Sequence, residues 1–162
     1  MTENSKITTV EPMKNKYHGL YKAFSESAAQ QSYAVRRKVG CCIVTRTGLT
    51  AVGWNGMPAG LGNVCEWQVW DGGNNVVGTT KPMVIHAERN ALDKLTRQGI
   101  SPEGSLLFVT TAPCIECAKS IHAVGVKEVY YRDDYHDTAG PDFLKSVGIP
   151  VYKYEGDYDG TI

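Results

Sequence analysis

The sequence predicts a three-layer α/β/α domain, with a five-stranded mixed sheet and helices on both of its faces. Three observations lead to this fold class. The apolar pattern switches between helical and strand periodicity, amphipathic helices separate the later strands, and no linker-like stretch divides the 162 residues. Helices that alternate with strands act as crossovers between parallel strands and cover both faces of a sheet. We therefore expect one domain over residues 1–162, with a flexible N-terminal arm at 1–16.

The expected elements follow one another as α-β-β-α-β-α-β-α-β. The first helix, at 17–31, places Leu20, Phe24 and Ala28 on one face. Two short strands at 39–45 and 49–54 come next, joined by a turn that contains glycine. The remaining elements are a helix at 87–98, a strand at 105–110, a helix at 114–124, a strand at 128–131, a short helix at 141–147 and a strand at 150–154.

Between the second strand and the second helix, neither periodicity persists. The stretch GMPAGLGNVCEWQVWDGGNNVVGTTKP is rich in glycine and asparagine and carries Trp67 and Trp70. It predicts a long loop at 57–82, held by packing of the two tryptophans. A loop of this length inside a compact domain is usually functional.

The overall charge bears on the class of partner. The 17 basic and 17 acidic residues cancel, whereas domains that bind nucleic acid usually carry a basic excess. No apolar run approaches the roughly 20 residues that cross a bilayer, and the N-terminal stretch lacks the apolar centre of a signal peptide. We expect a cytoplasmic protein, in the host cytoplasm if it is viral, with no membrane or nucleic-acid partner.

Three side chains form a candidate metal site. His86 directly precedes one predicted helix, and Cys114 and Cys117 open another. Cysteines three apart at a helix start point to the same side, so both sulfurs can bind one ion. Two thiolates and one imidazole leave the fourth position of a tetrahedral zinc site open, as in catalytic sites. Cys65 could reach this site only if the long loop folded back, and we do not expect it to be a ligand.

The other cysteines have a simpler interpretation. Cys41 and Cys42 lie in an apolar stretch and are expected to be small buried core residues. Five cysteines are an odd number without the spacing of a disulfide framework.

Two motifs together resemble the signature of zinc nucleobase deaminases, namely H-A-E at His86–Glu88 and P-C-x-x-C at Pro113–Cys117. In such enzymes the glutamate, here Glu88, shuttles protons between water and the base. Longer stretches are similar to the deoxycytidylate (dCMP) deaminases of the cytidine deaminase superfamily. These stretches are VGCCIV with GWNGMPAG, HAERNAL, VTTAPCIECAKSIHAVGVKEVYY and DYHD.

The resemblance covers residues 17–154 and implies a cytidine-deaminase-like fold with one catalytic Zn²⁺ per chain. It implies hydrolysis of dCMP to dUMP and ammonia, which supplies dUMP for thymidylate synthesis. His86, Cys114 and Cys117 would hold the zinc, and Glu88 would be the catalytic proton shuttle. The implied substrate-binding residues are Asn55, Ala87, Thr111, Ala112 and Tyr135. Two of them also have ordinary interpretations, because Asn-Gly is a common turn dipeptide and Tyr135 is one of nine tyrosines.

Regulation is a further implication of the resemblance. Many dCMP deaminases are homohexamers that are activated by dCTP with Mg²⁺ and inhibited by dTTP. Their effector region falls on Gly53, Asn55 and Gly56 of this chain. The basic residues Arg36, Arg37 and Lys38 suit either a 5′-phosphate or an effector triphosphate, and a solvated charge run is an equally good interpretation.

Several alternatives remain open from the sequence. The chain could be a bifunctional dCTP/dCMP deaminase, or a deaminase of cytosine nucleosides or the free base. A tRNA adenosine deaminase shares both zinc motifs, but it would need a basic surface for its RNA. Outside this class, the cysteines could form a structural zinc clip or a redox pair, and hydrolytic turnover would separate these from an enzyme.

Overall fold

The computed structural model describes residues 14–70, 72–73 and 75–155. A short 3-10 helix, η2 (Asn15–Tyr17), leads into the first α-helix. The elements that follow are α1 (His18–Ala29), β1 (Gly40–Val44), β2 (Thr50–Trp54), β3 (Glu66–Trp70), β4 (Asn75–Thr80), α2 (Ala87–Arg97), β5 (Leu106–Thr111), α3 (Ile115–Ala123), β6 (Glu128–Asp133), α4 (Ala139–Ser146) and β7 (Val151–Lys153).

The main sheet has five strands in the order β2-β1-β5-β6-β7. β1 is antiparallel to both of its neighbours, β2 and β5. β5, β6 and β7 run parallel to one another, and α3 and α4 provide the crossovers between them. The predicted mixed sheet is therefore confirmed, and the nine predicted elements lie within two residues of those in the structure.

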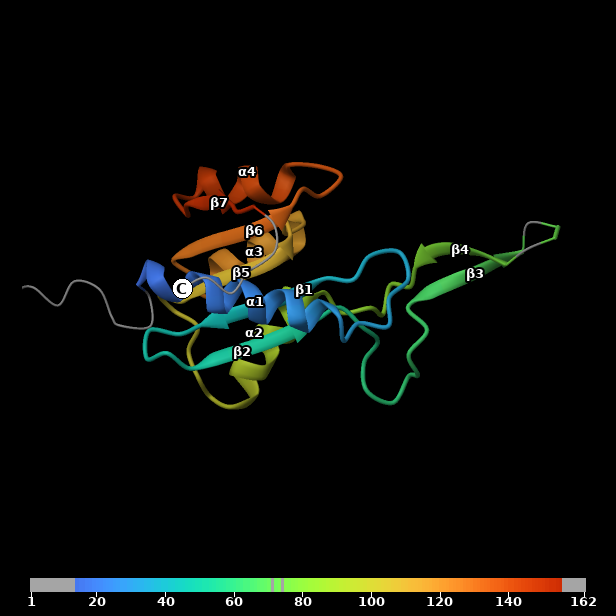
Figure 1. Cartoon of the computed structure of the whole chain (residues 1–162), viewed down its shortest axis with the longest axis horizontal. Coiled ribbons are helices and arrows are strands. Elements are labelled where there is room, and N and C mark those ends of the chain that lie inside the picture. The colour runs from blue at the N-terminus through green and yellow to red at the C-terminus, as the bar shows by residue number, and fades with distance from the viewer. Residues whose placement is uncertain (1–13, 71, 74, 156–162) are drawn as a thin grey trace, which may run out of the picture.

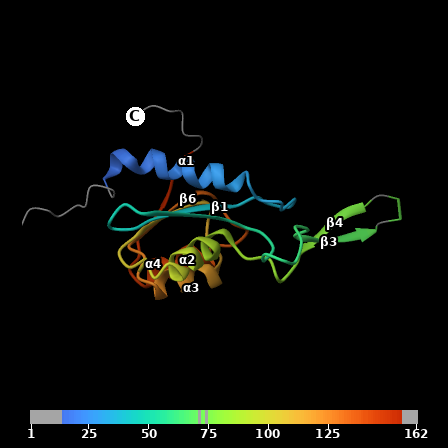
Figure 2. The same cartoon turned by 90° about the horizontal axis from the view of Figure 1, so that it is seen from below.

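Helices cover the sheet on both faces, with α1 alone on one side and α2, α3 and α4 on the other (Figure 2). Successive side chains along β1 point to opposite faces of the sheet, so they contribute to two separate cores. Cys41 and Ile43 belong to the core under α2, α3 and α4, while Cys42 and Val44 belong to the core under α1. Both cysteines are fully buried, which confirms their expected role as core residues.

Gly40 lies where α1 comes closest to β1. A Cβ atom at this position would lie 1.9 Å from the carbonyl oxygen of Ser25 and 2.4 Å from the backbone nitrogen of Ala29. Both atoms are helix backbone, which cannot move aside as a flexible side chain can. The glycine thus sets the distance between the first helix and the sheet.

The prediction of a long loop at 57–82 was wrong for its second half. β3 and β4 pair as a separate two-stranded antiparallel hairpin, which projects from the main body (Figure 1). Four of the five β3 residues are exposed, so buried and exposed side chains do not alternate along β3 as they do in a half-buried strand. The expected tryptophan packing is also wrong, because Trp67 and Trp70 are 49% and 69% exposed.

The predicted N-terminal arm at 1–16 falls mostly on residues 1–13, which lie outside the described residues. Asn15 and Lys16, at its end, are already part of η2. Within the described part of the chain, no helix has both the length and the apolar character needed to cross a membrane.

The substitution Gly40→Ala is expected to destabilise the fold by about 2–3 kcal/mol, since α1 must move away from β1 to admit the new methyl group. Gly73→Ala is the matched control, because a Cβ there meets no atom within 4 Å, and its effect should stay within about 0.5 kcal/mol. Urea denaturation would measure both values. Equal stability of the two variants would contradict the close approach.

Candidate active site

Two helix starts meet on one face of the sheet. His86 is the N-cap of α2 and Cys114 is the N-cap of α3, and both residues have extended backbone. Each site residue therefore lies at the end of a loop that immediately becomes a helix. Exposed backbone N–H groups and the helix dipole make such starts favourable for negatively charged groups, thiolates included.

The three candidate ligands lie close together, as their spacing in the sequence predicts. The Nδ1 atom of His86 lies 3.5 Å from Sγ of Cys114 and 3.4 Å from Sγ of Cys117. All three ligand atoms lie within 4.8 Å of one another. Usual zinc–nitrogen and zinc–sulfur bond lengths give a nitrogen–sulfur edge of about 3.6 Å in a tetrahedral site. The donor set and its spacing therefore fit zinc.

Hydrogen bonds distribute the charge among these groups. The bonds that Cys114 receives from Cys117 and His86 lower the pKa of the Cys114 thiol to about 3. The hydrogen bond between His86 and Cys114 raises the pKa of His86. The hydrogen bond between Cys117 and Cys114 raises the pKa of the Cys117 thiol. The lowered pKa favours the thiolate form of Cys114, which is the form that binds zinc.

Glu88 lies in the first turn of α2 and is only 4% exposed. Burial raises the pKa of its carboxyl group above the usual value, despite the opposing effect of a backbone hydrogen bond. A raised pKa brings the carboxyl closer to the pH at which it can both accept and donate a proton. Its place beside the ligand cluster suits the role of proton shuttle.

The cluster opens into a cavity of about 520 Å³. Its lining includes all five residues predicted to bind substrate, together with Arg36 and Arg37. Lys38, Gly53 and Gly56, the other predicted effector or phosphate residues, are not among the lining residues. Six further lining residues were not predicted from the sequence, namely Glu66, Thr79, Thr80, Val39, Val84 and His136. The first three belong to the hairpin that the sequence presented as a loop, and His136 lies within the DYHD stretch.

Asn55 has a structural role that its sequence motif did not reveal. Its Oδ1 atom accepts a hydrogen bond from the backbone N–H of Val39 at 2.8 Å, and its Nδ2 atom donates to the carbonyl of Arg37 at 2.8 Å. The backbone carbonyl of Asn55 accepts a bond from the Ser32 hydroxyl. Asn55 thus connects the end of β2 to the segment that precedes β1, and contact with a substrate stays a prediction.

The two glycines of the same motif serve close packing and pairing. A Cβ atom on Gly53 would lie 2.4 Å from the carbonyl oxygen of Ala87, so this glycine lets α2 approach β2. Gly56 forms two backbone hydrogen bonds with Ile85, which fixes the chain immediately before His86. Both glycines position the start of α2.

The fold and this site define a class, the zinc-dependent deaminases that hydrolyse an amino group from a nucleobase. The model for the cytidine and deoxycytidylate deaminase zinc-binding region matches residues 14–133. The chain belongs to the cytidine and deoxycytidylate deaminase family of hydrolases, and its resemblance to dCMP deaminases is confirmed.

Individual relatives agree with this assignment. The deoxycytidylate deaminase of Mus musculus is 34% identical over 142 residues, which cover 83% of this chain and 78% of the mouse protein. The Homo sapiens deoxycytidylate deaminase is 36% identical over 134 residues, with coverage of 78% and 73%. A crystal structure of the dCMP deaminase from cyanophage S-TIM5, in complex with dCMP and dUMP, is 42% identical. It superposes with a TM-score of 0.78 and covers 88% of this chain and 99% of that one.

Asn55→Ala is expected to lower the free energy of unfolding by about 2 kcal/mol, because it leaves the Val39 N–H and the Arg37 carbonyl without their partner. The exposed Asn63 offers a matched control, and Asn63→Ala should leave stability nearly unchanged. Urea denaturation measures the difference. A wild-type midpoint for Asn55→Ala would show that the two backbone bonds do not hold the segment.

Proposed function

We propose that the protein is a zinc-dependent enzyme that hydrolyses dCMP to dUMP and ammonia, and thereby supplies dUMP for thymidylate synthesis. The observation that carries this proposal is the buried Glu88 beside the cluster of His86, Cys114 and Cys117, at a cavity that two arginines also line. The curated relatives named deoxycytidylate deaminase and the cyanophage enzyme that binds dCMP and dUMP support the choice of substrate.

The chemistry divides between the metal and Glu88. A zinc ion held by His86, Cys114 and Cys117 would act as a Lewis acid that makes water a better nucleophile. Glu88 accepts a proton from the water that attacks C4 of the cytosine ring, and it passes this proton to N3. It then carries the proton of the new hydroxyl group to the exocyclic amine, which leaves as ammonia, and the C4 carbonyl forms. Each transfer needs a carboxyl group that is hydrogen-bonded and shielded from bulk water.

The remaining predicted substrate residues line the same cavity. Ala87, Thr111 and Ala112 are buried and close to the ligand cluster in sequence, which suits contact with the base. Asn55 and Tyr135 are partly exposed, which suits contact with the sugar. Arg36 and Arg37 are exposed lining residues whose charge suits the 5′-phosphate.

Regulation and assembly form the finer part of the proposal. We propose a homohexamer, located in the cytoplasm, that dCTP with Mg²⁺ activates and dTTP inhibits. The support is the likeness of GWNGMPAG to the effector region of dCMP deaminases, with Gly53 and Gly56 as its candidate residues and Lys38 as a candidate for the effector phosphates.

The direct test is turnover of dCMP, followed as the loss of cytosine absorbance, with and without dCTP and Mg²⁺. Steady conversion to dUMP supports the proposed reaction, and a steep rise with dCTP supports the regulation. Deamination of dCTP itself would indicate the bifunctional dCTP/dCMP deaminase. Zinc-loaded protein that leaves dCMP unchanged would overturn the proposal and direct attention to nucleosides or tRNA.

Glu88→Gln is expected to lower kcat for dCMP by about 10²–10⁴-fold, because the amide cannot accept and release a proton. Zinc content, measured by plasma mass spectrometry, should stay at the wild-type level. Glu103→Gln is the control, since Glu103 is exposed and absent from the cavity lining. Substantial turnover by Glu88→Gln would contradict the proton-shuttle role.

Cys117→Ser is expected to lose zinc on dialysis against a chelator that leaves the wild-type protein loaded, because it removes one of three ligands. Cys65→Ser should keep its zinc, since the Cys65 thiol is buried elsewhere and points to the Asn63 carbonyl. Plasma mass spectrometry measures both contents. Equal retention by the two variants would exclude Cys117 as a ligand.

A further inference from the structure

We infer that Glu66 is a positioning residue, which holds the arginines that bind the phosphate end of the substrate. Hairpin β3–β4 therefore forms one wall of the active site. The inference rests on the proposed function, since it concerns how this chain binds a nucleoside monophosphate rather than a nucleoside. It assigns a role to the element that departs most from the sequence prediction.

Glu66 is a buried carboxylate with unusual partners. It is the first residue of β3 and only 2% exposed. Its Oε1 atom accepts hydrogen bonds from two consecutive backbone N–H groups, those of Val35 at 2.9 Å and Arg36 at 3.1 Å. Hydrogen bonds to an ionised acceptor are stronger than those between neutral groups. Glu66 thus fixes the backbone of a segment 30 residues earlier in the chain.

The segment that Glu66 holds is the connector between α1 and β1, residues 30–39. It has no helix or strand of its own, so contacts from other elements must set its shape. Asn55 binds the backbone of Arg37 and Val39 from the side of the main sheet. Glu66 binds the backbone of Val35 and Arg36 from the side of the hairpin. The two anchors leave little freedom for the arginines between them.

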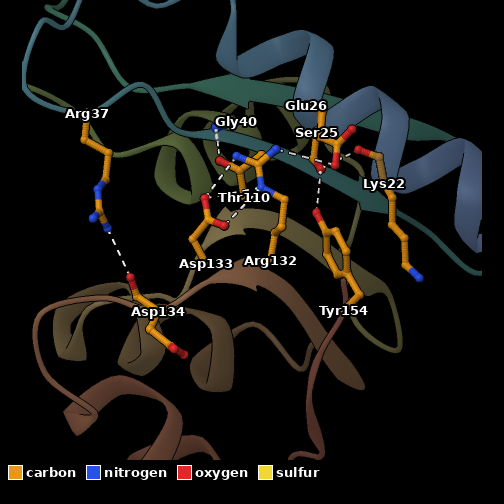
Figure 3. Close-up of polar contacts among 10 residues, drawn as sticks. All are labelled: Lys22, Ser25, Glu26, Arg37, Gly40, Thr110, Arg132, Asp133, Asp134 and Tyr154. Atoms are coloured by element: carbon orange, nitrogen blue, oxygen red, sulfur yellow. Dashed lines mark hydrogen bonds and ion pairs between the residues drawn. The ribbon is translucent and has the colours of Figure 1, made fainter. Parts of the chain in front are cut away.

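Both arginines of the connector face the cavity with their charge available. The Arg36 guanidinium group donates to the Thr80 hydroxyl of β4 at 3.5 Å. Figure 3 shows the contact of Arg37, which donates to the backbone carbonyl of Asp134 at 3.2 Å. Within the described part of the chain, neither arginine forms an ion pair with a carboxylate. Their partners are neutral oxygens, which orient the guanidinium groups without neutralising them.

This arrangement matches a phosphate monoester. Glu88 and the ligand cluster line the same cavity as the two arginines. The base can therefore lie against Glu88 and the cluster while the phosphate contacts the arginines. Guanidinium groups recognise phosphate oxygens best when they are held in one orientation. Glu66 supplies that orientation through the backbone and Thr80 supplies it through the Arg36 side chain. Neither residue needs to touch the base.

The test compares ligands with and without a phosphate in the zinc-loaded protein. Glu66→Ala is expected to raise KM for dCMP and the inhibition constant of dUMP by about tenfold, while kcat changes by less than about twofold. The inhibition constant of deoxyuridine, which lacks the phosphate, should stay unchanged. Glu66→Gln keeps one neutral acceptor and should lie between Glu66→Ala and wild type, and Glu103→Ala serves as the matched surface control.

Three results would overturn the inference. Parallel weakening of dUMP and deoxyuridine would mean that Glu66 only supports the fold. Tighter dUMP binding by Glu66→Gln would mean that the carboxylate repels the phosphate. Full additivity of Glu66→Ala with Arg36→Ala would mean that Glu66 does not act through Arg36, because residues that act as a unit are not additive.

A second variant tests the same inference if Glu66→Ala fails to fold. Thr80→Val leaves the Glu66 anchor in place and removes only the side-chain partner of Arg36. It should raise the inhibition constant of dUMP by about threefold and leave that of deoxyuridine unchanged. An unchanged inhibition constant for dUMP would contradict the role of hairpin β3–β4 in phosphate binding. Wild-type protein that does not hydrolyse dCMP would instead reject the proposed function, so the two failures are distinct.

Discussion

The site depends on the close approach of two helix starts to the backbone that surrounds them. Gly53 lets the first turn of α2 lie against β2. Gly140 lets α4 lie against the turn before α3, since a Cβ on Gly140 would lie 1.9 Å from the carbonyl oxygen of Pro113. His86 and Cys114 occupy the cap positions of these two helices. A methyl group at either glycine would meet the backbone next to one of these caps.

The sequence predicted those features that depend on short spacings. Cys114 and Cys117 lie one helical turn apart, so their shared direction follows from helix geometry alone. The elements of the main sheet were predictable because most of their side chains face a core on one or both sides, as the full burial of β1 and β5 shows. To predict that His86 lies next to the cysteines, the H-A-E and P-C-x-x-C motifs had to be considered together, since each alone has other interpretations.

The hairpin and its anchor were not predicted, for a physical reason. β3 exposes four of its five residues, so no core supports it, and the short alternation at 65–69 lies among glycine and asparagine residues that indicate a loop. The bonds of Glu66 connect residues about 30 positions apart through backbone N–H groups, which every residue except proline possesses. No residue type at position 35 or 36 marks such a partner. Asn55 was singled out as a substrate contact, and its two backbone bonds became visible only in the structure.

The connector between α1 and β1 has a consequence for how this protein can diverge. The proposed proton shuttle, Glu88, lies in the first turn of a helix. The two arginines belong to a segment without regular structure, whose backbone Asn55 and Glu66 hold. Because these anchors bind the backbone, exchange of the side chains at positions 36 and 37 is expected to leave the chemistry proposed for Glu88 unchanged. If the proposed roles hold, the residues that select the nucleotide can change while the residues that carry out the reaction stay the same.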